Sequence, residues 1–444
     1  GYPGEIGGAF TLDHFVAVYS DGFFDVPTLL ANTLVVAVGM TVTGVALGLT
    51  LAWLFVRTNL PTKGGLELVL LSGQAIPGYV FGIMYITAYG PQNGLVSVAV
   101  ADALGLGSLS VGLFTPWGVA FVAGVNVVST AYLLTVPALQ DMDASFEEVS
   151  RIHGASVTET LRSVTLPLVK PALLSAVITV FLYGMGEFAI VSVLGSRHGF
   201  DVYSTVIGSA INSRFPPAYG QAAALSCSLL LATGVLVYYY RRVTSRKQDF
   251  MTLTGRSGRR RTWDLGRWRW PLAGGLWAVV ALVWLLPILA MALTSLHSTW
   301  TGSVRLSGLS LEHYVTAVTS PGLREAFVNS VLVAVGAATL GTVLVVGAAY
   351  YTERTDGRFR GAVDFLTLTP LAVPGIITGA GLIFLSLWVG KLPGVTLYGT
   401  LAIIALGSVI VFLPVSSRIA VGNVVQIHSV LEEAARVAGA SWLR

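Results

Sequence analysis

Nine stretches of the sequence are each long enough and apolar enough to cross a lipid bilayer as a helix. A helix that crosses about 30 Å of hydrocarbon needs about 20 residues with few charges. Because lipid offers the backbone no hydrogen-bond partner, and because these stretches are too long for barrel strands of about ten residues, we expect α-helices. The stretches are 28–56, 66–89, 116–139, 172–194, 218–240, 271–296, 326–351, 362–389 and 396–415. The sequence therefore predicts an all-α, polytopic membrane protein with nine transmembrane helices.

The composition excludes a water-soluble protein. Only 11% of the 444 residues are charged, whereas a soluble domain has about 25%. The net charge of +4 is too small and too dispersed to indicate a nucleic-acid partner. The single cysteine, Cys227, excludes a disulfide framework and is expected to be a small packing residue. The six histidines lack the neighbours that a metal site needs, so we assign no metal ligand and no cofactor.

The lysines and arginines set the orientation of the helices, because cytoplasmic loops are rich in both. If the loop with Arg57 and Lys63 is cytoplasmic, 21 of the 26 basic residues lie on the cytoplasmic side, ten of them in 241–269. Residues 91–115 then form an external short helix or a re-entrant segment, since Asp102 and several glycines interrupt their apolar run.

The second half of the sequence repeats features of the first. Three matching pairs share an offset of 297 residues: Asn32-Thr33 with Asn329-Ser330, Arg57-Thr58 with Arg354-Thr355, and Pro77-Gly78 with Pro374-Gly375. Matches in one order, at one offset and on equivalent helices indicate duplication. Equivalent helices of the two halves run in the same direction, so the repeat is parallel, with an axis along the membrane normal.

The repeat divides the chain into three parts. We expect a first half in 1–240, a basic cytoplasmic linker in 241–270 and a second half in 271–444. We interpret the linker as a solvated tether near anionic lipid headgroups. Its Trp263, Trp268 and Trp270 are interpreted as anchors at the membrane interface.

Two cytoplasmic segments, 146–156 and 431–441, match each other at an offset of 285 residues. Each is predicted to contain a short helix that is broken at a glycine, Gly154 or Gly439. The first is predicted to continue into a second short helix that Pro167 ends. A surface helix with small residues at this position favours a closely packed partner.

These segments resemble the coupling loop of binding-protein-dependent ABC importer permeases. In that family the loop reads Glu-Ala-Ala, three residues, Gly, nine residues, then Ile or Val, any residue, and Leu-Pro. The second copy has Glu433-Ala434-Ala435 with Gly439 in register. The first copy has Glu148, Gly154 and the complete ending, but Val149-Ser150 replaces the two alanines. This departure is expected to make the two loops unequal.

The resemblance covers essentially the whole chain and is greatest to fused permeases, of which iron(III)-type importers are the commonest. It implies two six-helix repeats, so that the nine predicted helices lack the first half's opening helix and the second half's last two. It also implies a multi-pass location in the plasma or inner membrane of a prokaryote. The implied partners are two copies of an ABC ATPase subunit, an extracytoplasmic substrate-binding protein and the lipid bilayer.

The resemblance implies that each loop docks into a groove on one ATPase subunit. The residues expected to serve this coupling are Glu147, Glu148, Gly154, Pro167, Glu432, Glu433, Ala434, Ala435 and Gly439. Among them, Glu148 and Glu433 are expected to cap or make polar contacts within the loop. The chain's Gly390-Lys391 is followed by Leu392, which does not fit a phosphate-binding loop. The chain is therefore expected to be a transport subunit and not an enzyme, with ATP hydrolysed by a partner chain.

A translocation path is predicted where the helices break. Pro77-Gly78 and Pro374-Gly375 lie inside predicted spans, and matched breaks in two repeats indicate a path between them. Glu187 is the one charge predicted deep in a span, where a carboxylate needs a cavity or a partner. Either a pathway role or a structural hydrogen bond to neighbouring backbone would satisfy it.

Two other classes of function remain as alternatives. An ion-coupled secondary transporter also uses repeats and broken helices, but it is expected to have several ionisable residues at mid-membrane. An intramembrane enzyme would need a catalytic cluster, which no predicted span offers. For the leading interpretation the substrate is iron(III) by resemblance, with thiamine, phosphonates and polyamines as alternatives.

Overall fold

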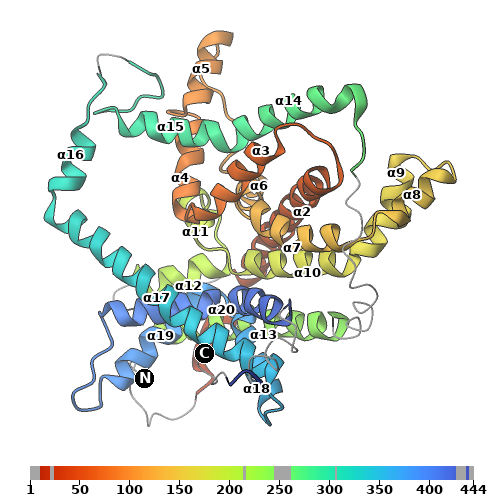
Figure 1. The fold of residues 1–444 in the computed structure, drawn as a ribbon. Coiled ribbons are helices and arrows are strands. Elements are labelled where there is room, and N and C mark those ends of the chain that lie inside the picture. The colour runs from red at the N-terminus through yellow and green to blue at the C-terminus, as the bar shows by residue number, and fades with distance from the viewer. Residues whose placement is uncertain are drawn as a thin grey trace. The chain divides into compact units, whose positions relative to one another are not determined.

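The computed structural model describes residues 11–20, 25–213, 217–244, 262–305, 308–426 and 437–439. Apart from two isolated β-bridges, every regular element in these ranges is a helix (Figure 1). Within the described ranges, six helices are long and apolar enough to cross a membrane, and the number rises to nine if three bent helix pairs each count as one span. The prediction of an all-α, polytopic membrane protein is confirmed.

The described helices form two compact units, one over Thr11–Ala317 and one that begins at Val318. The larger unit contains the first half, the described end of the linker and the opening span of the second half. That span consists of α14 (Arg269–Val280), the π-helical turn η6 (Ala281–Leu285) and α15 (Leu286–Ser295). The boundary between compact units thus lies further along the chain than the predicted boundary between repeats.

The core of the larger unit surrounds α2 (Val26–Arg57), which packs against α6 (Pro116–Asn126), α7 (Val128–Asp141) and α10 (Leu166–Met185). Two glycines one turn apart allow this close packing. A Cβ on Gly48 would lie 2.7 Å from the Cβ of Ala131, and one on Gly44 would lie 2.8 Å from Cγ2 of Val127. Small residues bring membrane helices into backbone contact, where dispersion forces hold them together.

The two Pro-Gly breaks are much sharper than kinks. The segments Lys63–Ala75 and Gly78–Tyr89 meet at 115°, and Arg360–Leu371 and Gly375–Val389 meet at 109°. The residue before proline avoids the helical region, and both Ile76 and Val373 are extended. Predicted spans 66–89 and 362–389 are therefore each two helices: α3 (Lys63–Ser72) with α4 (Gly78–Tyr89), and α18 (Arg360–Leu368) with α19 (Gly375–Val389).

The fourth span begins and ends earlier than predicted. It runs over Val157–Met185 and comprises α9 (Val157–Thr160), the π-helical turn η2 (Leu161–Thr165) and α10. Predicted span 172–194 is wrong at its carboxyl end, because Gly186 ends α10 and a separate helix, α11 (Ala189–Leu194), follows. Glu187 lies in the break between these helices and not deep in a span.

The opening span of the second half is held to α4 by two tyrosines. The π-helical turn η6 in this span is a single-turn bulge within an α-helix. The Tyr85 hydroxyl donates to the Val283 carbonyl at 2.9 Å, and the Tyr89 hydroxyl donates to that of Leu282. Helix α15 accordingly packs on α4.

The remaining helices complete the two units. In the larger unit, α5 (Leu95–Leu104) is a short apolar helix within 91–115, as predicted. In the smaller unit, α17 (Pro321–Arg354) packs along α20 (Leu401–Gln426). The others are α1 (Asp13–Ser20), α8 (Ser145–Ile152), η3 (Ser196–His198), α12 (Tyr203–Asn212), α13 (Tyr219–Thr244), η5 (Gly266–Trp268), α16 (Glu312–Thr319), η1 (Gly73–Ala75) and η8 (Thr369–Ala372).

Candidate coupling site

Helix α8 has one buried face and one exposed apolar face. Glu147 on the inner face is only 3% exposed. Phe146, Val149 and Ile152 on the outer face are 54%, 53% and 83% exposed. Their spacing of three residues places them on one side of the helix. The helix therefore presents an apolar stripe while its acidic side is fixed to the protein.

Gly154 forms the break after α8, as the sequence predicts. Its φ of +85° is in the left-handed region, which favours glycine. The Gly154 amide donates to the Arg151 carbonyl at 2.9 Å, and the Ala155 amide donates to that of Ser150 at 3.1 Å. These two bonds make a Schellman ending. Gly439 has the same backbone conformation, with φ of +82°.

A capping box starts the next helix directly after this turn. The Glu159 amide donates to the Ser156 hydroxyl at 3.3 Å, and the Ser156 amide donates to the Glu159 carboxylate at 2.7 Å. Ser150 and Thr160 join the two helices through their hydroxyls at 3.0 Å. Ser150, one of the departures from the Glu-Ala-Ala pattern, thus braces the loop.

Replacing Gly154 with alanine is expected to lower the free energy of unfolding by about 1–2 kcal/mol, because the new Cβ is strained at positive φ. A matched control is Gly275→Ala in α14, where a Cβ would meet open space. There the substitution is expected to stabilise by about 0.5–1 kcal/mol, since alanine favours a helix interior. Unfolding of the purified protein in detergent measures the effect of each substitution, and equal effects would contradict the turn.

A buried ion pair fixes the inner face of α8. Arg57, at the end of α2, is as buried as Glu147, and its Nη2 lies 2.6 Å from the Glu147 Oε2. Thr165 donates its hydroxyl to the Glu147 Oε1 at 2.8 Å. Buried charges are tolerated only with such partners. The carboxylate therefore positions the helix and is not displayed to a partner.

Trp263 of the linker completes the contacts of Glu147. Its indole Nε1 donates to the Glu147 Oε2 at 3.0 Å. The Arg151 guanidinium lies over the same ring, 4.5 Å from its centroid, in a cation–π contact. The interpretation of Trp263 as a lipid-interface anchor is therefore wrong, whereas Trp268 and Trp270 are exposed. The described end of the linker is docked on the first half and is not a free tether.

Of the other predicted coupling residues, some lie where the structure describes them and some do not. Pro167 does not end a helix, because it lies in the first turn of α10 and the span continues through it. The preceding π-helical turn adjusts the backbone before the proline, which lacks an amide hydrogen. Glu148 is half-buried beside Glu147. The four acidic and alanine residues of the second loop, Glu432, Glu433, Ala434 and Ala435, lie outside the described residues.

The predicted pathway residues of the first half lie close together. A Cβ on Gly78 would be 3.3 Å from the Cβ of Ala189, because α11 packs against α4 at the Pro77-Gly78 break. The Glu187 Oε1 accepts the Ile190 amide at 2.9 Å, so its carboxylate caps α11. In the smaller unit, Pro374 precedes α19 and Gly375 begins it, with open space around the glycine.

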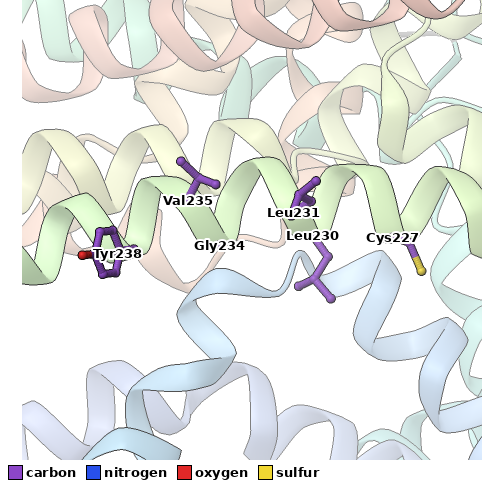
Figure 2. A pocket seen from close by; sticks show the side chains of 6 residues that line it. All are labelled: Cys227, Leu230, Leu231, Gly234, Val235 and Tyr238. Carbon is purple, nitrogen blue, oxygen red and sulfur yellow. The ribbon is translucent and has the colours of Figure 1, made fainter.

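A hollow along α13 carries no cluster of polar groups. Figure 2 shows its lining on one face of this helix: Cys227, Leu230, Leu231, Gly234, Val235 and Tyr238. Cys227 is exposed there, which differs from the packing role that the sequence indicates. The apolar lining supports no solute site.

Sequence reasoning missed the partners of Glu147. Arg57 could have been singled out from the sequence, because it recurs as Arg354 in the repeat. Arg354 also binds α20, a helix of its own unit, donating from Nη2 to the Val424 carbonyl at 2.8 Å. Thr165 and Trp263 carry no comparable signal.

Comparison with known proteins shows what the chain is similar to. Residues 44–248 match the model of the family described as binding-protein-dependent transport system inner membrane component. A probable ABC transporter permease of Sinorhizobium fredii is 26% identical over 93% of this chain and 72% of its own length. A putative ferric transport system permease of Haemophilus influenzae is 26% identical over 73% of this chain. A ferric transport system permease of Actinobacillus pleuropneumoniae is 26% identical over 71%.

Coverage of the relatives is incomplete. The chain spans 50% and 45% of the lengths of the two ferric permeases. Among solved structures, a bacterial ABC transporter involved in alginate import matches with a TM-score of 0.46 and 17% identity over 54% of this chain and 85% of its own. On the family match over residues 44–248 and the named relatives, the chain is similar to the binding-protein-dependent transport permeases of ABC transporters.

Proposed function

We propose that this chain forms the translocation path of an ATP-driven importer and couples to two copies of a separate ATPase. The observation that carries the proposal is the apolar stripe of Phe146, Val149 and Ile152 on a braced helix. An exposed apolar helix face of this kind fits a groove on a partner protein. The positive-inside rule puts this loop in the cytoplasm, where an ATPase would meet it.

The second coupling site is proposed around Gly439. Its left-handed backbone matches that of Gly154, which supports a second turn of the same kind. Glu432, Glu433, Ala434 and Ala435 are proposed to precede that turn on a helix equivalent to α8. Glu148 and Glu433 are proposed to serve coupling through capping or polar contacts within their loops, whereas Glu147 acts by fixing the helix.

The path is proposed to involve the breaks at Pro77-Gly78 and Pro374-Gly375. The contact of Gly78 with α11, the helix that Glu187 caps, supports a junction that can change shape. Two relatives are named as ferric transport permeases. We therefore propose iron(III) as the substrate, presented by an extracytoplasmic binding protein at a prokaryotic inner membrane.

Reconstitution tests this function. The full permease, placed in liposomes with the ATPase and binding protein encoded beside it, is expected to take up iron(III) only with ATP. Thiamine, a phosphonate and a polyamine serve as competing solutes. Uptake driven by an ion gradient without ATP would instead support a secondary transporter and overturn the proposal.

A further inference from the structure

We propose that Trp263 is a positioning residue that ties the first coupling helix to the opening span of the second half. Through this tie, displacement of that span would reach α8 and the ATPase. The inference rests on the coupling function proposed above and assigns the linker a part in it.

The backbone of Trp263 is fixed to the end of α2. Its amide donates to the Arg57 carbonyl at 2.7 Å, and its carbonyl accepts the Asn59 amide at 3.0 Å. The two extended segments make an isolated parallel β-bridge between Thr58 and Trp263. Because both the amide and the carbonyl of Trp263 are hydrogen-bonded to the end of α2, the direction of the Trp263 side chain is set.

Neighbouring linker residues strengthen this attachment. The Asn59 side chain donates to the Asp264 carboxylate at 2.7 Å and accepts the Leu265 amide at 2.9 Å. Hydrogen bonds from the Gly266 amide and the Asn59 side chain hold the pKa of Asp264 below its usual value. The segment is thus attached through both backbone and side chains.

The indole then holds α8 at two points. Glu147 accepts its N–H, and Arg151, one turn further along α8, lies over its ring. Residues four apart share one face of a helix. The indole therefore restrains rotation of α8 about its axis, and this rotation determines where the apolar stripe points.

The same linker segment continues directly into the opening span. The turn η5 follows Leu265, and α14 begins at Arg269. Trp277 of α14 donates its indole N–H to the Thr62 hydroxyl at 2.9 Å, so this span is attached to the loop after α2 as well. Together with the Tyr85 and Tyr89 bonds to η6, the span contacts both the bent helix pair and, through Trp263, the coupling helix.

Two substitutions of Trp263 test the inference in the complete transporter. Trp263→Phe keeps a ring for Arg151 and removes the donor to Glu147, while Trp263→Ala removes both. For Trp263→Ala, we expect the amount of iron(III) transported per ATP hydrolysed to fall about tenfold or more. The reason is that this variant loses a hydrogen bond to a charged group. Trp263→Phe is expected to give an intermediate ratio. Binding of the ATPase is expected to stay within about threefold, since the apolar stripe is retained.

Trp268→Ala is the matched control, because Trp268 is an exposed indole in the same segment. It is expected to leave the transport-to-hydrolysis ratio unchanged. An unchanged ratio in Trp263→Ala would overturn the inference, and if that variant fails to assemble, an unchanged ratio in Trp263→Phe would do so. Failure of the unmodified permease to bind the ATPase would instead contradict the proposed function.

Discussion

Replacing Glu147 with alanine is expected to lower the free energy of unfolding by about 3–5 kcal/mol, because it leaves a buried charge without its partner. Arg57 is 3% exposed, and its Nε already has no hydrogen-bond partner among the described residues. Without Glu147, the guanidinium still donates from Nη1 to the Met142 carbonyl at 3.4 Å. Denaturant unfolding of the purified permease in mixed micelles measures the loss.

Glu148→Ala is the matched control for this prediction. It removes the same charge from the same helix at a half-buried position, and a change of about 1 kcal/mol or less is expected. The double variant Arg57→Met with Glu147→Leu is expected to recover most of the stability, because an apolar pair can replace a buried ion pair. If Glu147→Ala and Glu148→Ala were equally destabilising, the ion pair would not be what holds α8.

This contrast shows what the sequence can predict about the loop. Gly154 was predictable because a left-handed turn requires a specific residue, and the same requirement appears again at Gly439. The separate roles of Glu147 and Glu148 were not predictable. They depend on which side of α8 faces Arg57, a residue 90 positions away in the chain.

The spans, like the loop, have some features that the sequence predicts and others that it does not. Apolar runs predict that helices cross the membrane, because the bilayer imposes a minimum length. They do not predict a bend of 115° at Pro77, although the proline marks its place. The end of α10 at Gly186 was missed because the apolar run continues into α11 across a break that a Glu187 side chain caps. Capping across a break leaves little trace in average hydropathy.

The coupling surface yields the second large prediction. Ile152→Asp is expected to weaken binding of the ATPase by about 30-fold or more, since central apolar residues of an interface contribute about 2 kcal/mol or more. Ile152 is 83% exposed in the permease, so the substitution leaves the packing inside the permease unchanged. The measurement is titration of ATPase onto permease in lipid nanodiscs.

Two further variants show whether the effect belongs to this surface. Ile152→Leu keeps the apolar area and is expected to bind within about threefold of the unmodified permease. Val111→Asp places the same charge on an exposed residue in the loop between α5 and α6, and binding should not change there. Since Phe146 and Val149 share the stripe, Phe146→Asp should reproduce the loss. Normal binding by both stripe variants would show that the ATPase contacts another face, because a charge buried in an apolar contact cannot be accommodated without cost.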